Sequence, residues 1–245
     1  MISTLALASV LTAPAGTAVM IHGAGGGGWE YDFWRPVFAR NGWNVEARDL
    51  VPENGDLAQT TFDDYVKQVG GWQKDAPRPL ILVGASMGGG IALKAAETLR
   101  PDAIILVNSV APKGFREARD TSDIPDIIRW ADGPLKDTED SMPDSDRRTI
   151  LWAWKKWRDE SGQVVRTLRS GLEVEKPKCP VLVIIGEKDT DIPPEVSRRV
   201  AEAYGADVHF YAGMSHVGPL LSTRANEVAV AAQEWVARRM SDRRK

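Results

Sequence analysis

The chain is poor in cysteine and in histidine. Its 245 residues include one cysteine, Cys179, and three histidines, His22, His209 and His216. A single cysteine rules out an internal disulfide and any cysteine-rich metal site. So few histidines also leave no cluster of the kind that holds zinc, and we expect no metal.

The chain also lacks a strong excess of either charge and a long apolar run. The formal net charge is −3 and no long basic stripe occurs, so we expect neither nucleic acid nor an anionic membrane surface as a partner. No segment has the apolar length of a membrane-spanning helix, so no stable membrane insertion is expected. What remains is the composition of an ordinary soluble globular protein.

The N-terminal segment MISTLALASVLTAPAG contains a short apolar stretch followed by Ala13-Pro14-Ala15, which loosely fits a small-residue cleavage site. A secretory signal starts with positive charge, and this segment has no Lys or Arg before its apolar run. We therefore expect an extra edge strand or an ordered arm here, and a cytoplasmic protein. Export is the alternative, if the segment acts as a weak signal peptide.

Short apolar, β-branched runs alternate with helical patterns along most of the chain. This alternation predicts an α/β fold, with a mostly parallel sheet and helices on both of its faces. Thr60 or Thr61 is the expected cap of the second helix. The predicted strands are 17–22, 44–50, 79–85, 102–109, 180–187 and 207–212, and the predicted helices are about 31–41, 60–72, 87–100, 194–204 and 223–240.

The alternation stops between residues 110 and 177. This stretch is rich in charged residues, Pro and Trp, and it contains no buried-strand pattern. We expect one domain over residues 1–245, with a core formed by 1–109 and 178–245. The stretch at about 110–177 is then a helical cap insertion that lies over one end of the sheet.

Glycines crowd the stretch HGAGGGGW behind the first predicted strand. Gly23, Gly25 and Gly28 spell G-x-G-x-x-G, the phosphate-binding fingerprint of dinucleotide folds, and Asp49 follows at about the distance of a ribose-binding acid. His22 in front of the glycines favours another function, a loop that binds an oxyanion. The two hypotheses are decided by the rest of the chain.

The stretch GASMGG, residues 84–89, matches G-x-S-x-G between a buried strand and a helix. This context is the one in which a nucleophilic serine occurs, because the tight turn exposes the hydroxyl of Ser86. Gly84 and Gly88 leave room for the chain to fold back on itself. The N-terminus of the following helix directs its free N–H groups toward the hydroxyl.

A serine nucleophile needs a base, and the base needs an orienting acid. On such a sheet the chain order is Ser, then an acid, then His, and GEKDTDIPP and GMSHVGP supply the last two after successive strands. We choose Asp189 as the acid and His216 as the base. Asp191 is interpreted as a favourable charge at a helix start, and His209, inside a strand, as a packing or surface residue.

Together the stretches HGAGGGGWEYDFW, GASMGG, GEKDTDIPP and GMSHVGP resemble the α/β-hydrolase superfamily, over nearly the whole chain outside the insertion. The glycine loop followed by Trp29 is particularly similar to the esterase and hydroxynitrile-lyase branch, which includes methyl esterases. The resemblance implies an α/β-hydrolase fold. It also implies that the backbone N–H groups of Ala24 and Met87 bind the oxyanion, where two fixed donors stabilise a tetrahedral intermediate.

The resemblance favours an esterase within this superfamily. Plant hydroxynitrile lyases carry a lysine close behind the catalytic histidine, where this chain has Val217, and haloalkane dehalogenases carry an aspartate at the position of Ser86. In an esterase, His22 braces the loop that contains Gly23 and Gly25. The dinucleotide hypothesis would leave the order of Ser86, Asp189 and His216 unexplained.

Tryptophans are frequent in the insertion. Ile150, Trp154 and Trp157 follow the i, i+4, i+7 spacing of one helical face, so we expect them to pack against the sheet domain. The alternative is that Trp154 or Trp157 lines a substrate pocket, and Trp29 beside the glycine loop has the same two interpretations.

The sequence therefore predicts a serine hydrolase that cleaves carboxylic esters of small to medium size through an acyl-enzyme intermediate. It needs no cofactor, and its partner is a small-molecule ester. Other chemistries of the same fold, such as those of a lactonase, a C–C hydrolase or a perhydrolase, are alternatives. Another is a hydrolase-like ligand-binding protein with little turnover. The oligomeric state stays open.

Overall fold

A computed structural model describes residues 15–73 and 76–242. Six parallel strands form one sheet in the order β2-β1-β3-β4-β7-β8. The N-terminal segment, for which the sequence predicts an edge strand or an arm, lies almost entirely outside the described residues. The strands are β1 (Gly16–Ile21), β2 (Trp43–Glu46), β3 (Leu80–Ala85), β4 (Ala103–Val107), β7 (Val181–Gly186) and β8 (Asp207–Tyr211).

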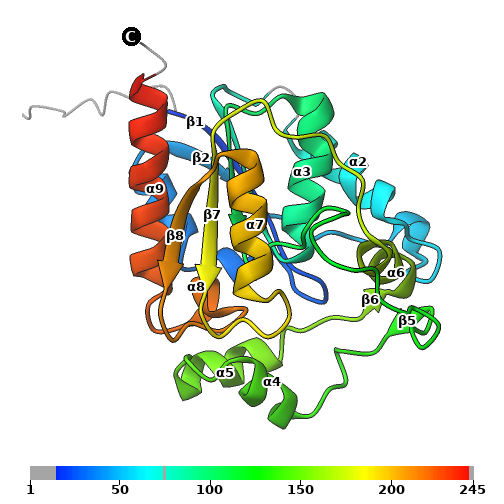
Figure 1. Cartoon of the computed structure of the whole chain (residues 1–245). Helices are drawn as coiled ribbons and strands as arrows, with labels where there is room; N and C mark the ends of the chain where they lie inside the picture. The colour runs from blue at the N-terminus through cyan, green and yellow to red at the C-terminus, as the bar shows by residue number, and fades with distance from the viewer. Residues whose placement is uncertain (1–14, 74–75, 243–245) are drawn as a thin grey trace, which may run out of the picture.

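Helices cover both faces of the sheet (Figure 1). Alternate strand residues divide between two apolar clusters, as expected of parallel strands buried on both sides. On one face the strands pack against α1 (Arg35–Arg40) and α9 (Ala225–Asp242), and on the other against α2 (Phe62–Trp72), α3 (Met87–Leu99) and α7 (Pro194–Tyr204). The predicted fold class is therefore confirmed.

Most predicted elements are present, and the differences have local causes. The strand predicted at 44–50 ends at Glu46 because the backbone beyond it pairs with side chains: Ala47 O accepts from Arg35 and Leu50 N–H donates to His22. The helix predicted at 31–41 begins only at Arg35, as α1, and it is preceded by a 3-10 turn, η1 (Gly28–Tyr31), and a further turn at 32–34. Thr61 is the cap of α2, in a reciprocal pair with Asp64.

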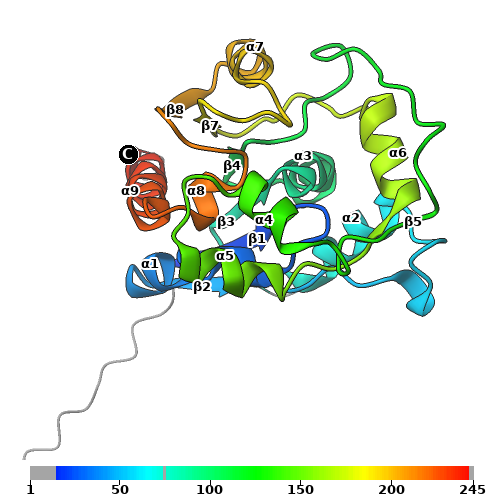
Figure 2. The same cartoon turned by 90° about the horizontal axis from the view of Figure 1, so that it is seen from below.

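The segment between β4 and β7 contains α4 (Leu135–Ser141), α5 (Arg147–Trp154) and α6 (Gly162–Ser170). It also contains a short antiparallel pair that the sequence did not indicate, β5 (Ile127–Ile128) with β6 (Glu160–Ser161). Helices α4 and α5 lie beyond the carboxyl ends of the strands, whereas α6 lies beside α2 (Figures 1 and 2). Of the insertion, α4 and α5 thus lie over the end of the sheet that carries the predicted catalytic residues.

Two short elements complete the described chain, the 3-10 turn η2 (Glu53–Gly55) and the helix α8 (Gly218–Leu221). Within residues 15–73 and 76–242, no helix is both long and apolar enough to cross a membrane.

Candidate active site

Ser86 lies in a sharp turn between β3 and α3. Its backbone angles are φ 49° and ψ −117°, a conformation that costs on the order of 1–3 kcal/mol for a residue with a side chain. Glycines make the turn possible: a Cβ on Gly84 would lie 2.2 Å from the Gly88 carbonyl oxygen, and one on Gly88 would lie 2.0 Å from that of Ile21. Ser86 is partly exposed and lines a cavity at the carboxyl end of the sheet.

Asp189 and His216 form a hydrogen-bonded pair at the same carboxyl end of the sheet. Asp189 follows β7, His216 follows β8, and His216 Nδ1 lies 2.8 Å from Asp189 Oδ1. The same oxygen accepts the backbone N–H groups of Asp191 and Ile192, each at 2.9 Å. Because the Asp189 oxygen is an acceptor, the neutral imidazole carries its proton on Nδ1, which leaves Nε2 as the basic nitrogen.

The charges around His216 favour its protonated form. Burial acts to lower the pKa of His216, but the hydrogen bond and charge of Asp189, with the charges of Asp191 and Glu30, outweigh burial and raise it. The Asp191 carboxylate lies 3.8 Å from His216 Nε2 and lines the cavity. Asp191 therefore lies beside the imidazole of His216 and precedes the first turn of α7, which begins at Pro194.

Two side chains that sequence reasoning missed hold the loop of His216. Asn108, just after β4 and with φ 42°, donates from Nδ2 to the carbonyl oxygens of His216 (2.7 Å) and Ser215 (3.2 Å). Its Oδ1 accepts the Gly186 N–H at 2.8 Å. Asp144, from the loop between α4 and α5, accepts the N–H (3.0 Å) and the hydroxyl (2.7 Å) of Ser215. The insertion is thus fastened to the histidine loop.

The peptide between Gly23 and Ala24 is oriented by hydrogen bonds. The Gly23 carbonyl oxygen accepts from His22 Nδ1 at 2.7 Å and from the Gly26 N–H at 3.2 Å. In a planar trans peptide the N–H points opposite to the carbonyl, so the Ala24 N–H is directed away from these groups. Ala24 lines the cavity, and no acceptor for its N–H occurs among the described residues.

Met87, the other predicted donor, is the first residue of α3. The first N–H groups of a helix have no partner within it, so the Met87 amide is available at the turn of Ser86. It carries the partial positive charge of the helix N-terminus.

His22 braces the glycine loop through both ring nitrogens. Nε2 accepts the Leu50 N–H at 2.9 Å while Nδ1 donates to Gly23 O. Burial lowers the pKa of His22 to about 4, so the ring is neutral near pH 7. Asp49, the ribose-binding candidate of the dinucleotide hypothesis, instead accepts the Gly28 N–H of the same loop at 2.8 Å.

The cavity at Ser86 has a volume of about 350 Å³. Of the three tryptophans proposed for a pocket, Trp157 lines it; Trp29 packs edge-on against Trp157 at 4.9 Å between ring centroids and is not among the lining residues. Trp154 is also outside the lining and donates its indole N–H to Gly133 O. The lining consists of Gly23, Ala24, Glu30, Ala85, Ser86, Trp130, Gly133, Pro134, Asp137, Thr138, Ser141, Trp157, Asp191, His216, Val217 and Leu220.

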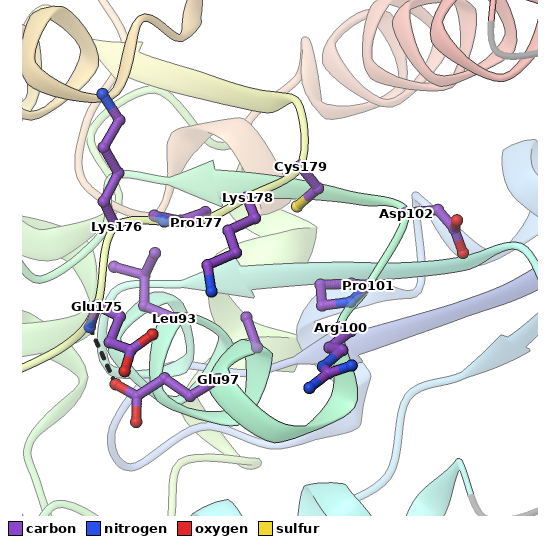
Figure 3. A pocket seen from close by; sticks show the side chains of 11 residues that line it. Leu93, Glu97, Arg100, Pro101, Asp102, Glu175, Lys176, Pro177, Lys178 and Cys179 are labelled. Carbon is purple, nitrogen blue, oxygen red and sulfur yellow. Dashed lines mark hydrogen bonds between the residues drawn. The ribbon is translucent and has the colours of Figure 1, made fainter.

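A larger cavity, of about 480 Å³, lies at the opposite end of the sheet, before β4 and β7 (Figure 3). Charged side chains on its wall include Glu97, Arg100 and Lys178, and Glu97 accepts the Glu175 N–H at 3.0 Å. Its described lining residues include neither serine nor histidine. Across residues 15–73 and 76–242, no group of His, Cys, Asp and Glu has the arrangement of a metal site.

The comparisons with known proteins agree with this architecture. A family model described as "Alpha/beta hydrolase family" matches residues 18–232. The chain therefore belongs to the alpha/beta hydrolase family. A search of curated protein sequences finds no match.

Solved structures of methylesterase-like hydrolases are similar over nearly the whole chain. Polyneuridine aldehyde esterase has 18% sequence identity and a TM-score of 0.69, with 90% of this chain and 98% of that chain covered. A methylesterase from Arabidopsis, MES16, has 18% identity, a TM-score of 0.68 and the same coverage. Tomato Methylketone Synthase I, complexed with 2-tridecanone, has 17% identity and a TM-score of 0.70, again with 90% and 98% covered. At these identities the likeness concerns the fold.

Proposed function

We propose that this alpha/beta hydrolase is a serine esterase that cleaves carboxylic esters of small to medium size. The observation that carries the proposal is the 2.8 Å pair of His216 and Asp189 beside the cavity that Ser86 lines. The esterase names of polyneuridine aldehyde esterase and the Arabidopsis methylesterase agree with this chemistry.

In the first half of the reaction, Ser86 Oγ attacks the ester carbonyl carbon while His216 Nε2 takes the hydroxyl proton. The carbonyl oxygen becomes an oxyanion, to which the N–H groups of Ala24 and Met87 donate. Loss of one such donor typically costs about 10²–10³ in rate. The tetrahedral intermediate collapses when His216 returns the proton to the leaving alcohol, and the acyl group stays on Ser86.

In the second half, His216 takes a proton from water and the resulting hydroxide attacks the acyl carbonyl. The second tetrahedral intermediate uses the same oxyanion donors. Its collapse releases the carboxylic acid and returns the proton to Ser86. Asp189 stabilises the imidazolium that forms in both halves.

The charges of the cavity favour neutral or cationic esters. Its lining contains the carboxyl groups of Glu30, Asp137 and Asp191, and neither Lys nor Arg occurs among its described residues. A carboxylate on the substrate would therefore be repelled, although solvent screens the charges of the exposed Asp137 and Asp191 more than that of the buried Glu30. The rings of Trp130 and Trp157 add apolar surface for the acyl or alcohol part.

The proposal is tested with a panel of matched esters. The panel contains methyl and nitrophenyl esters with neutral, cationic and anionic acyl groups, together with a lactone and a 1,3-diketone. We expect hydrolysis of the neutral and cationic esters and loss of that activity in Ser86→Ala. Turnover of the lactone or the diketone alone would replace the esterase assignment by another chemistry of the fold, and unchanged activity in Ser86→Ala would refute the mechanism.

A further inference from the structure

Glu30 is a buried carboxyl group inside the candidate active site that the proposed reaction does not use. It belongs to the 3-10 turn η1, is 4% exposed, and lines the cavity together with Ser86 and His216. Its Oε2 accepts the backbone N–H of Gly23 at 3.0 Å. Gly23 itself faces the nucleophile, since a Cβ on it would lie 3.5 Å from Ser86 Cβ.

A second buried glutamate acts on the other side of Ala24. Glu160, in β6 of the insertion and 3% exposed, accepts the Gly25 N–H at 3.0 Å. Glu160 is itself held by the Tyr65 hydroxyl and the Ser161 N–H, each at 2.8 Å. The N–H groups on both sides of Ala24 therefore end on carboxylates, while the Ala24 N–H between them has no protein acceptor among the described residues.

This pattern fixes the direction of the Ala24 N–H. A loop rich in glycine has many backbone conformations of similar energy, and a donor works in an oxyanion site only when it is held before the charge develops. Three consecutive peptide units are oriented here, the first through Glu30, the second through His22 and the third through Glu160.

We propose that Glu30 is a positioning residue, whose hydrogen bond to the Gly23 amide holds the following Ala24 N–H toward the oxyanion in front of Ser86. The inference rests on the proposed function, because it assigns Ala24 to the stabilisation of that oxyanion. Glu30 touches neither the reacting carbonyl nor the proton in transit; it acts through the loop.

The charge of Glu30 supplies a second, separable effect. The ionisable groups that face it are His216, Arg158 and Tyr31. Burial raises the pKa of Glu30 to about 7, against the lowering effects of the Gly23 N–H, His216 and Arg158. The ionised carboxylate also raises the pKa of His216, together with Asp189 and Asp191. A neutral acceptor at position 30 would keep the hydrogen bond and remove this influence on the imidazole.

The test compares Glu30→Ala, which removes the acceptor, with Glu30→Gln, which keeps an acceptor and removes the charge. Asp32→Asn is the matched control, because Asp32 is an exposed carboxylate two residues away, and it lies 3.8 Å from its ion-pair partner, the half-buried Arg35. Each variant is compared with the wild type by kcat and KM for a neutral ester, by the pH profile of kcat/KM, and by the rate of Ser86 phosphonylation with a fluorophosphonate. Thermal unfolding reports whether each variant is folded.

We expect Glu30→Ala to lower kcat and the phosphonylation rate about 10- to 100-fold with little change in KM, which is part of the loss seen when an oxyanion donor is removed. Glu30→Gln should recover kcat to within about 3-fold of the wild type. Its acid limb of kcat/KM should lie at lower pH, because His216 must be neutral to act as the base and loses a neighbour that favours its protonated form. Asp32→Asn should match the wild type in all readouts.

Two results would overturn the inference. The first is a folded Glu30→Ala with wild-type kcat, and the second is a folded Glu30→Gln as slow as Glu30→Ala. An acid limb unmoved in Glu30→Gln would overturn the charge effect alone. Failure of the proposed function gives a different result, because the wild type itself would neither hydrolyse the ester nor form an adduct at Ser86. The role proposed for Glu30 would then be refuted as well.

Discussion

The two cavities at opposite ends of the sheet differ in how their walls are built. The amino-end cavity is the larger, about 480 Å³ against about 350 Å³. Most of its charged side chains, such as Arg100, Lys176 and Lys178, are exposed. At the carboxyl end, by contrast, Glu30, Asp189 and His22 are buried and hydrogen-bonded to the loops that surround Ser86.

The burial and hydrogen bonding of the charged side chains therefore distinguish the two cavities. Burying a polar group costs free energy unless it is hydrogen-bonded, and buried titratable groups with shifted pKa values gather where chemistry is done. The carboxyl-end cavity holds such groups beside a strained serine, whereas the described charged side chains of the amino-end cavity are exposed or partly exposed. Size alone would select the opposite end of the sheet from the one that we propose. Four changes test this comparison, and they are given in order of decreasing effect.

Replacement of Asp189 by Asn should lower kcat about 10³- to 10⁴-fold, because the variant loses the carboxylate that holds Nδ1–H and stabilises the imidazolium. Asp191→Asn is the matched control, and it should lose less than about 10-fold because Asp191 is exposed to solvent. Steady-state hydrolysis of a neutral ester measures both. A larger loss in Asp191→Asn would make Asp191 the orienting acid.

Acid should lower the free energy of unfolding, because His22 is buried in its neutral form. Its folded pKa of about 4 lies below the usual 6.5, so its contribution to stability is complete above about pH 6.5 and is lost as the pH falls toward 4. The expected loss is on the order of 3 kcal/mol, or about 100-fold in the unfolding equilibrium.

Urea unfolding of the wild type and of His22→Gln at several pH values isolates this contribution. The stability of the variant is subtracted from that of the wild type at each pH, because Glu30 changes the stability in the opposite direction. The folded pKa of Glu30 is raised, so its contribution to stability is present at low pH and is lost as the pH rises through about 7. The advantage of the wild type over the variant should shrink from pH 8 to pH 4. A difference that is the same at every pH would contradict the assignment.

Loss of the Asp144 side chain should reduce kcat about 10-fold, because Ser215 loses both of its hydrogen bonds to the insertion and the neighbouring His216 is held less well. Asp144→Ala is compared with Asp140→Asn, which changes an exposed carboxylate of α4 paired with Lys136. Equal activity in the two variants would show that the histidine loop does not depend on the insertion.

Lys178→Ala should change kcat/KM by less than about 2-fold, since its side chain is exposed and lies at the opposite end of the sheet from Ser86. The same ester assay measures it. A loss comparable to that of Asp189→Asn would place the function at the larger cavity instead.

Much of the fold follows from local patterns. Five of the predicted strands differ from the observed ones by no more than two residues at either end, because each is a continuous apolar run or ends at a turn signal. Their order also brings Ser86, Asp189 and His216 to one edge, since the carboxyl ends of parallel strands meet there.

The supporting side chains were not predicted, because their contacts join distant parts of the chain. Asp144 meets Ser215, and Glu160 meets Gly25, without any pattern in the sequence. Glu30 carried only a partial signal: WEYDFW places two acids, Glu30 and Asp32, among aromatic residues, and Glu30 is buried whereas Asp32 is exposed. Asn108, at the end of a buried strand, carried a weaker one. Trp154 has the spacing of a helical face, but this spacing does not show whether its side chain lines the cavity.

The most direct test of the central claim is the reaction of the folded wild type with a small fluorophosphonate, followed as an intact mass shift and mapped to a peptide. We expect one adduct, on Ser86, which is absent in His216→Ala and unchanged in Lys178→Ala. A folded wild type that forms no adduct, or forms one at another residue, would contradict a catalytic centre at the carboxyl end of the sheet.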